Sequence, residues 1–294
     1  RDAARTAECV RSLLDNNANH VLVWDNSEDN GTSAREIEQK LRHDHRVNIE
    51  ISPINAGFAL GVNLSIEKIR LSYPDAQILL INNDAILLPD AILALVKALK
   101  EHPDAVLAYP SIMHSDIVIG KIYYHRLTGM LTTSHLPGSF RYPSGCCMLI
   151  SLNRLTTQLF DECFFMYGED WYTGLQMTTQ KMAHLSKTLV LHEGSASSKQ
   201  GSSFYEDRLA AAHWLMAKKL ASGKLELFFL YLFRISALGS RALLRSIRFK
   251  STTPLRALYT GWLIAHGHDP VHERALSVFR SCSGTISSKA SQEK

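Results

Sequence analysis

Carboxylate and amide side chains follow three short hydrophobic or alternating segments in the first third of the chain. Asp25, Asn55 and the pair Asn83-Asp84 each come just after such a segment. Segments of this kind, bounded by turn residues, predict β-strands. Ligands of parallel sheets bind at the carboxyl ends of the strands, so these side chains are candidates for a ligand site. The alternative is that any one of them ends a strand only because loops are polar.

A second group of polar residues is the carboxylate pair Glu169-Asp170. The pair follows Gly168 and the apolar residues 164–167. These neighbours would place the carboxylates at a partly desolvated rim, where their pKa values can be raised toward those of a general base. The alternative is a pair of acidic residues at a helix N-terminus, stabilised by the helix dipole.

The elements that must position these residues alternate along the first half of the chain. Hydrophobic periodicity predicts helices over 3–16, 33–43, 55–69, from 89 onward and 171–183, and strands over 20–24, 47–51, 77–81, 106–109, 146–150 and 188–191. The rest of the segment 105–145 is predicted as loop. Strand and helix in alternation are typical of an α/β fold with a parallel sheet. Beyond residue 203 the composition shifts to long helices, and the tail after residue 280 is expected to be disordered.

Composition narrows the class of protein. The 294 residues are 46% hydrophobic, enough for a sizeable core. Lys and Arg exceed Asp and Glu by 32 − 28 = +4, too little to argue for nucleic acid as a partner. The five cysteines form no C-x-x-C pair, which argues against a disulfide framework or zinc ribbon and favours the cytoplasm. The most apolar stretch, 225–238, contains Glu226 and Arg234 and is short for a membrane span.

Five motifs occur in an order that resembles a known family. They are Asp25-Asn26-Ser27, the stretch 55–63 (NAGFALGVN), Leu80-Ile81-Asn82-Asn83-Asp84, the stretch 164–170 (FFMYGED) and His192-Glu193-Gly194-Ser195. Over roughly residues 1–200 the chain resembles the family 2 inverting glycosyltransferases, closest to rhamnosyltransferase-like enzymes of bacterial surface polysaccharide assembly. The resemblance implies a GT-A fold: a mixed, mostly parallel sheet flanked by helices. We therefore expect a GT-A domain over residues 1–203, a helical extension over 204–280 and a tail over 281–294.

The resemblance also implies roles for the candidate residues. Asp84 and His192 would hold Mg²⁺ or Mn²⁺ together with the diphosphate of a nucleotide-sugar donor. Asp170 would be the catalytic base, and Glu169 would contact a sugar. The residues expected to contact the nucleotide sugar are Asp25, Asn55, Gly57, Gly61, Asn63 and Asn83. The two glycines could instead permit close helix–sheet packing. The favoured donor is dTDP-linked rhamnose or a similar deoxyhexose, and the acceptor a glycan or lipid-linked glycan.

The chain departs from the family pattern in two respects. Tyr172 and Gln176 stand where relatives carry further charged residues. The chain also enters on the helix that should follow the family's first strand, so that strand is expected to be missing. An alternative function is therefore a GT-A scaffold without turnover, or with impaired turnover, that acts as a membrane-associated binding or assembly subunit.

The C-terminal region has an uneven charge distribution. Six basic residues and no acidic ones lie between residues 234 and 256. Arg234, Arg241, Arg245 and Arg248 fall on one helical face, and Leu225, Phe228, Phe229, Leu232 and Leu243 on the opposite one. This pattern predicts an amphipathic helix on an anionic membrane surface, at the inner face of the cytoplasmic membrane. The alternative is a helix packed on the catalytic domain with its basic face in water.

Overall fold

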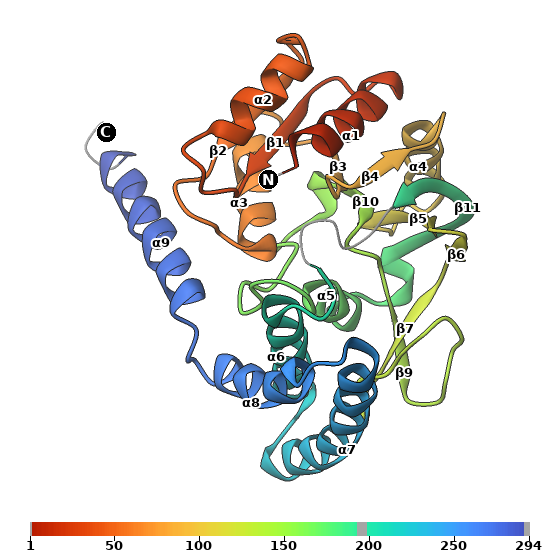
Figure 1. Cartoon of the computed structure of the whole chain (residues 1–294). Helices are drawn as coiled ribbons and strands as arrows, with labels where there is room; N and C mark the ends of the chain where they lie inside the picture. Colours follow the sequence, from red (N-terminus) through yellow and green to blue (C-terminus); the bar gives the residue numbers. More distant parts are fainter. Residues whose placement is uncertain (1, 193–198, 291–294) are drawn as a thin grey trace.

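A computed structural model describes residues 2–192 and 199–290 of the chain. Strands and their flanking helices occupy the first two thirds, and four C-terminal helices follow (Figure 1). The candidate motif residues Glu193, Gly194 and Ser195 lie outside the described residues.

The chain opens with helices and strands in alternation, as expected. These elements are α1 (Ala3–Asp15), β1 (Val21–Asp25), α2 (Thr32–Lys40), β2 (Val47–Ile51) and α3 (Phe58–Ser72). The strands β1 and β2 are parallel, with Val21 opposite Val47 and Asp25 opposite Ile51. Asp2 caps α1 by accepting a hydrogen bond from the Arg5 backbone N–H at 3.2 Å.

The central sheet is formed by six strands, which lie between residues 77 and 192. Its elements are β3 (Gln77–Ile81), β4 (Ala85–Leu87), β5 (Leu107–His114), β6 (Ile117–Ile119), β10 (Cys147–Ser151) and β11 (Met182–His192), with α4 (Ala91–Glu101) packed against it. The order is β3-β10-β5-β11-β4, and β6 pairs with β5. The expected mixed sheet is confirmed.

The expectation that most strand pairs would be parallel is corrected by the structure. Only β1–β2 and β5–β11 pair in parallel among the described strands; the other pairs are antiparallel. The reason is that β10 inserts between β3 and β5, which share one direction and would otherwise be parallel neighbours. In the part of the chain that the structure describes, β1 pairs only with β2 and β3 only with β10, so no backbone ladder joins the two sheets.

One hydrophobic core nevertheless joins these two sheets. It contains Val21 of β1 and Leu149 of β10, together with Val10 of α1 and Leu95 of α4. Helix α1 contacts both β1 and β4. Side-chain packing therefore holds β1 beside the larger sheet where hydrogen bonds between the strands do not.

A small third sheet packs against the helix that begins with Glu169 and Asp170. It consists of β7 (Ile122–His125), β8 (Leu131–Thr132) and β9 (Ser139–Tyr142), a region predicted as loop. Helix α5 (Glu169–Gln176) packs against β9. Helix α5 ends at Gln176, earlier than the predicted helix over 171–183, because Met182 and Ala183 already belong to the buried start of β11.

Four helices complete the chain. They are α6 (Ser203–Leu220), α7 (Lys224–Phe249), α8 (Thr253–Ala265) and α9 (Pro270–Ala290). α9 runs back along the N-terminal half (Figure 1), where Ala275 packs against Ile54 and Leu60. Because α9 continues to Ala290, it reaches into the segment that was expected to be disordered; residues 291–294 are outside the described part.

The orientation of α7 corrects the expectation for its charged face. Arg234 is fully buried, whereas Leu225 is 73% exposed and Phe228 61% exposed. The arginine side chain is buried because polar groups of β7, α6 and the turn after β7 accept its hydrogen bonds. Arg234, Arg241 and Arg245 of the basic face therefore contact protein, whereas Arg248 at the end of the helix is exposed.

The core position of Leu95 gives a test of this fold. Leu95 is fully buried, whereas Leu93 in the same helix is 67% exposed. We expect Leu95→Ala to lower the free energy of unfolding by about 2–5 kcal/mol through lost burial and a cavity. The matched change Leu93→Ala should stay within about 0.5 kcal/mol. Urea unfolding followed by circular dichroism measures both; equal effects would contradict the placement of α4.

Candidate active site

Asp84 and His192 meet at the junction of β4 and β11. The imidazole Nε2 and the carboxylate Oδ1 are 3.1 Å apart, and their side chains are only 17% and 7% exposed. Sequence register explains the meeting, because His192 lies opposite Ala85 in the antiparallel β4–β11 pair. The two residues predicted to hold a cation are therefore adjacent, although they are 108 positions apart.

These two side chains provide one carboxylate and one imidazole, both usable as ligands of a divalent cation. Within the described ranges 2–192 and 199–280, no group of three or more His, Cys, Asp or Glu side chains could hold a metal. A cation at this place would thus take its remaining ligands from a diphosphate and water. The His114 ring also lies beside the His192 ring, with centroids 5.5 Å apart and planes tilted by 57°, a neighbour that sequence reasoning missed.

Glu169 and Asp170 begin α5 after an unusual turn. Tyr167 and Gly168 both have positive φ, 67° and 92°, and a Cβ on Gly168 would lie 2.8 Å from the Phe164 ring. The residue before α5 must therefore be glycine for the turn to pack. This turn directs the first two side chains of the helix into the protein, where Glu169 is 6% exposed.

Burial changes the acidity of both carboxyl groups. Desolvation, with the charge of Asp170 second, raises the pKa of Glu169 to about 8. Desolvation also raises the pKa of Asp170 to about 6, against hydrogen bonds from the backbone N–H groups of Gly145 and Trp171. The Glu169 Oε2 atom is buried without a hydrogen-bond partner in the described part of the chain. Near neutral pH the pair can therefore combine a protonated and an ionised carboxyl group.

A short backbone segment connects Asp170 to the Asp84 turn. The Gly145 N–H donates to Asp170 Oδ2 at 3.3 Å, and the next residue, Cys146, accepts from the Asn82 N–H at 2.9 Å. This segment leads into β10, whose residues are all buried. The base candidate in α5 and the turn that carries the cation candidate are thus both hydrogen-bonded to the segment before β10.

Asp25 ends β1 with one carboxylate oxygen occupied. Its Oδ1 accepts from the Ser27 N–H at 3.0 Å and from the Ser27 hydroxyl at 2.5 Å. Its Oδ2 is buried with no hydrogen-bond partner among the residues that the structure describes. Leaving a buried carboxylate oxygen without a donor costs free energy, because the oxygen has lost its bonds to water. This oxygen is therefore suited to accept a hydrogen bond from an N–H or O–H group of a ligand.

The loop from Asn55 to Gly57 is fixed by packing. Asn55 Oδ1 accepts from the Gly57 N–H at 2.9 Å, and a Cβ on Gly57 would lie 2.5 Å from the Phe165 carbonyl oxygen. A Cβ on Gly61 would lie 3.2 Å from the Trp24 indole nitrogen. Both glycines therefore have packing reasons in the structure, and this favours the packing alternative for them over direct ligand contact.

Two asparagines proposed for the nucleotide sugar also have protein partners. Asn63 is 3% exposed; its Nδ2 donates to the Phe160 carbonyl at 2.8 Å and to Glu162 at 3.1 Å, and its Oδ1 accepts from the Phe160 N–H. We therefore assign Asn63 to structure and do not retain it as a ligand contact. Asn83 is exposed and donates to the Thr6 hydroxyl at 3.0 Å, which leaves its oxygen toward solvent.

Asn26 is a residue whose importance the sequence did not reveal. Its Oδ1 accepts from the Ala56 N–H at 3.1 Å and from the Trp24 indole at 3.0 Å, and its Nδ2 donates to the Gly57 carbonyl at 2.9 Å. It thereby ties the end of β1 to the loop that contacts Phe165. Its place directly after Asp25 was the only signal available.

Of the two residues that depart from the family pattern, Tyr172 is packed against its neighbours and Gln176 is exposed. Tyr172 lies against the Phe164 ring at a centroid distance of 6.1 Å, and the Lys219 ammonium is 5.0 Å from the Tyr172 centroid. Gln176 is exposed at the end of α5. Neither residue carries a carboxylate to the site.

Comparison with known proteins identifies the first half of the chain. The sequence profile described as Glycosyl transferase family 2 matches residues 1–156. The chain belongs to glycosyl transferase family 2. This membership and the mixed sheet flanked by helices confirm the expected GT-A fold class, and the protein is a glycosyltransferase. The family match ends before Glu169, so the family assignment rests on the sheet and the donor-side motifs.

Two further comparisons add little detail. No curated protein sequence matches the chain. One solved structure that it resembles is the mannosyltransferase PcManGT from Pyrobaculum calidifontis, in complex with GDP-Man and Mn²⁺. The two are 12% identical with a TM-score of 0.49, and the match covers 96% of this chain and 77% of that chain.

The close packing of Gly57 gives a testable consequence. We expect Gly57→Ala to lower the free energy of unfolding by at least about 2 kcal/mol, because the new methyl group strains a positive φ and collides with Phe165. Gly267 has a similar φ of +88° with nothing within 4 Å of its Cβ position, so Gly267→Ala should cost only about 1 kcal/mol. Thermal unfolding of both variants measures the difference, and equal costs would exclude the proposed contact with Phe165.

Proposed function

We propose that this glycosyltransferase moves a sugar, with inversion at its anomeric carbon, from a nucleoside-diphosphate donor to a glycan or lipid-linked glycan. The main support is the hydrogen-bonded connection from Asp170 through Gly145 and Cys146 to the turn that carries Asp84. This connection links a carboxyl group of raised pKa with the turn next to a pair of side chains suited to a cation, and so supports the proposal. Direct displacement needs these two kinds of group at the acceptor side and at the leaving-group side.

The donor's nucleotide is proposed to bind at the end of β1. The buried Oδ2 of Asp25 is suited to accept from an N–H of the base. Asn55 belongs to the loop beside it, which Asn26 holds in place through the Gly57 carbonyl. Asn83 is available at the next strand end, on the exposed side of the Asp84 turn.

Asp84 and His192 are proposed to hold Mg²⁺ or Mn²⁺. Their oxygen and nitrogen atoms are 3.1 Å apart and shielded from solvent, which fits a cation shared with the donor diphosphate. When bound, the cation would neutralise the negative charge that develops on the leaving diphosphate.

Asp170 is proposed as the base and Glu169 as a hydrogen-bond donor. At neutral pH the Asp170 carboxylate is ionised and can take the proton of the acceptor hydroxyl as that oxygen attacks the anomeric carbon. The nucleoside diphosphate leaves from the opposite face, so the configuration inverts. Glu169, with a pKa raised to about 8, keeps its proton and can donate it in a hydrogen bond to a sugar hydroxyl.

The identity of the sugar is proposed from the motif resemblance alone. It favours dTDP-linked rhamnose or a similar deoxyhexose as the donor, and a surface-polysaccharide intermediate as the acceptor. A lipid-linked acceptor would place the reaction at the inner face of the cytoplasmic membrane.

Replacement of Asp170 tests the base. We expect Asp170→Asn to lower turnover by about 10²- to 10⁴-fold, because the amide cannot accept the proton. Nucleotide binding should remain. In the wild type, kcat/KM should rise with pH through about 6, where Asp170 loses its proton, and then level off; the variant should lack this limb. The turnover of the variant and the pH dependence of kcat/KM are both measured by the release of dTDP from dTDP-rhamnose.

The control for this experiment is Asp104→Asn, which removes an exposed carboxylate after α4 that belongs to none of the proposed sites. It should keep wild-type turnover. Equal turnover of wild type and Asp170→Asn would exclude Asp170 as the base and favour a scaffold without catalysis.

The donor and cation sites can be tested without turnover. We expect dTDP to raise the melting temperature by a few degrees, and Mn²⁺ to increase that shift, since a ligand at about 100 times its Kd stabilises by ~2.7 kcal/mol. Asp84→Asn should abolish the Mn²⁺ increment while the shift with dTDP alone persists. The absence of a shift with dTDP, UDP and GDP, each with Mn²⁺, would count against the proposed function.

A further inference from the structure

Helix α7 has the polarity of its two faces inverted relative to an ordinary surface helix. Arg234, at its inner face, is fully buried. The Arg234 guanidinium donates to the Tyr124 hydroxyl, to the His213 carbonyl at 2.8 Å and to the Arg126 carbonyl at 3.0 Å. A buried cation is tolerated only when hydrogen bonds satisfy it in this way.

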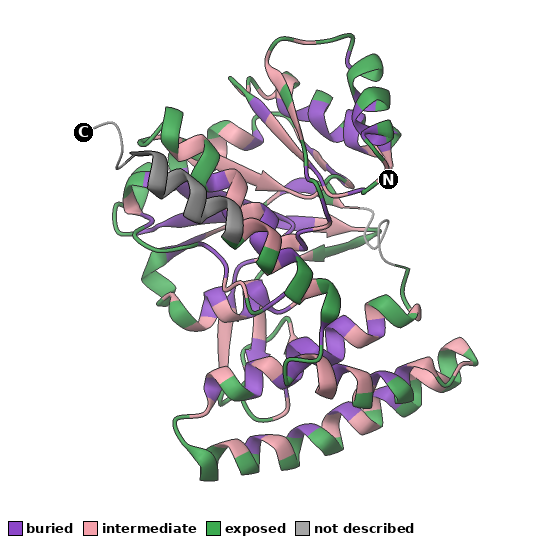
Figure 2. Ribbon diagram, turned by 90° about the vertical axis from the view of Figure 1, so that its left-hand side faces the viewer, coloured by how far each residue is buried: buried purple, intermediate pink, exposed green. Residues whose placement is uncertain are grey.

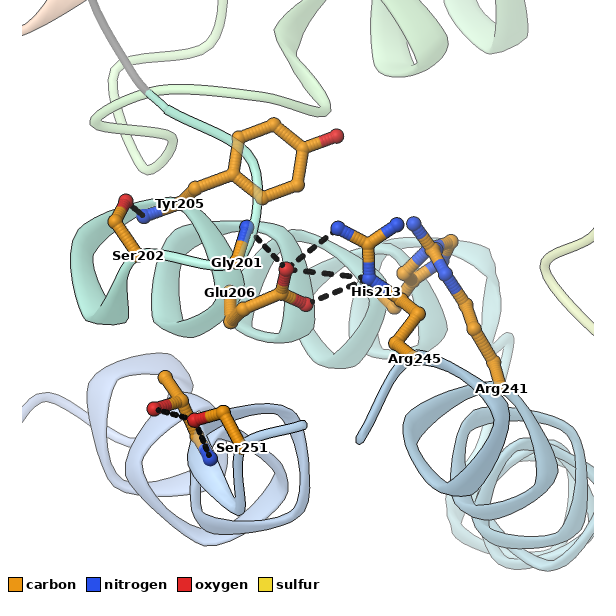
Figure 3. Close-up of polar contacts among 9 residues, drawn as sticks. Gly201, Ser202, Tyr205, Glu206, His213, Arg241, Arg245 and Ser251 are labelled. Carbon is orange, nitrogen blue, oxygen red and sulfur yellow. Dashed lines mark hydrogen bonds and ion pairs between the residues drawn. The ribbon is translucent and has the colours of Figure 1, made fainter. Parts of the chain in front are cut away.

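Two more arginines hold the same inner face to α6. Arg241 lies 3.1 Å from His213 Nε2, and Arg245 donates from Nε to both oxygens of Glu206 at 3.1 and 2.9 Å (Figure 3). Glu206 is 5% exposed and also accepts from the Gly201 N–H at 3.1 Å. Turning α7 over would leave these buried charges without partners, so its outer face is fixed by the inner one.

The outer face of α7 is apolar in two segments, residues 225–235 and 243–247, with the exposed residues Ser236 and Ser240 between them. Its exposed large side chains, between 46% and 73% accessible, are Leu225, Phe228, Phe229, Leu232, Phe233, Ile235, Leu243, Leu244 and Ile247. At 100° per residue these side chains fall in one stripe along a helix ~39 Å long, at 1.5 Å per residue. Figure 2 shows α7 along the lower edge of the molecule, with exposed residues over its length. Nine large apolar side chains exposed on one side of a helix mark an interaction site.

The charges beside this stripe indicate what covers it. Arg248, Lys250 and Arg256 are exposed where α7 ends and α8 begins, and no acidic residue lies between positions 234 and 256. Apolar residues flanked by exposed cations complement the interface of a membrane with anionic lipids.

Crossing of the membrane by α7 conflicts with its inner contacts. By length and composition α7 is the one helix in the described ranges that could cross a membrane, and only 22% of its most apolar window is buried. Its inner arginines, however, are bonded to α6 and β7, which would have to enter the hydrocarbon with them. A position parallel to the surface leaves these contacts intact.

We propose that the outer face of α7 docks on an anionic phospholipid membrane, with its apolar side chains in the interface and Arg248, Lys250 and Arg256 against the lipid headgroups. This surface differs from the basic face that the sequence pattern predicted. It does not depend on the sugar, the cation or the base.

Flotation of the full-length chain with vesicles tests the surface. Wild type should float with phosphatidylcholine vesicles and more strongly when these contain phosphatidylglycerol. The double variant Leu232→Asp, Leu243→Asp should lose binding by at least about tenfold, because charges enter the middle of the stripe. Leu232→Ser, Leu243→Ser should also weaken binding to uncharged vesicles, where repulsion between charges plays no part.

The matched control is Leu71→Asp, Leu93→Asp, which changes two leucines on α3 and α4 that are more exposed than Leu232 and Leu243. It should float like wild type, and all variants should melt within a few degrees of it. Changing Arg248, Lys250 and Arg256 to Gln should remove only the preference for phosphatidylglycerol.

Three results would overturn the proposal. The first is wild type that stays unbound with both kinds of vesicle. The second is an α7 variant that floats like wild type, or a control that loses binding equally. The third is a wild-type dimer, measured by light scattering, that becomes monomeric in the Leu232→Asp, Leu243→Asp variant and does not bind vesicles; the stripe would then join two copies of the chain.

Discussion

The position of the Asp170 carboxylate depends on the backbone at the start of β10. Gly145 donates to this carboxylate, and Cys146 accepts from the turn before Asp84. β10 is buried between β3 and β5 and cannot shift without breaking two ladders. The same strand that makes the sheet mixed therefore sets the relation between the base candidate and the cation candidate. Closely packed interiors transmit such a constraint with little compliance.

Burial of charge is the second constraint, and it operates on both halves of the molecule. Around Glu169 and Asp170 it raises two carboxyl pKa values, which is useful for proton transfer. Around Arg234 and Arg245 it is offset by hydrogen bonds and an ion pair, which hold α7 to the body of the protein. The helix consequently presents its apolar side outward. A catalytic sheet and a fixed apolar surface are thus joined through α6, which contacts α5, α7 and α8.

Local patterns predicted most of the first half of the chain. The strands at 20–24, 47–51 and 77–81 and the helices between them were correctly expected, because each has a clear period and clear turn residues. The sheet β7–β9 was missed, since its strands are short, pair across loops and are mostly half-buried, so they show no clear alternation. The antiparallel insertion of β10 was also missed, because an apolar run has no direction until its neighbours are known.

The sequence by itself determined where the strands end in polar residues, which carboxylates follow apolar turns, and that α7 has two unlike faces. Only the tertiary structure decided that Asp84 meets His192, that Asn63 is used inside the protein, and that three arginines of α7 (Arg234, Arg241 and Arg245) contact other elements of the protein. The physical reason is the same in each case. Periodicity is a local property of the chain, whereas a hydrogen-bond partner or a buried face is supplied by segments far away in the sequence.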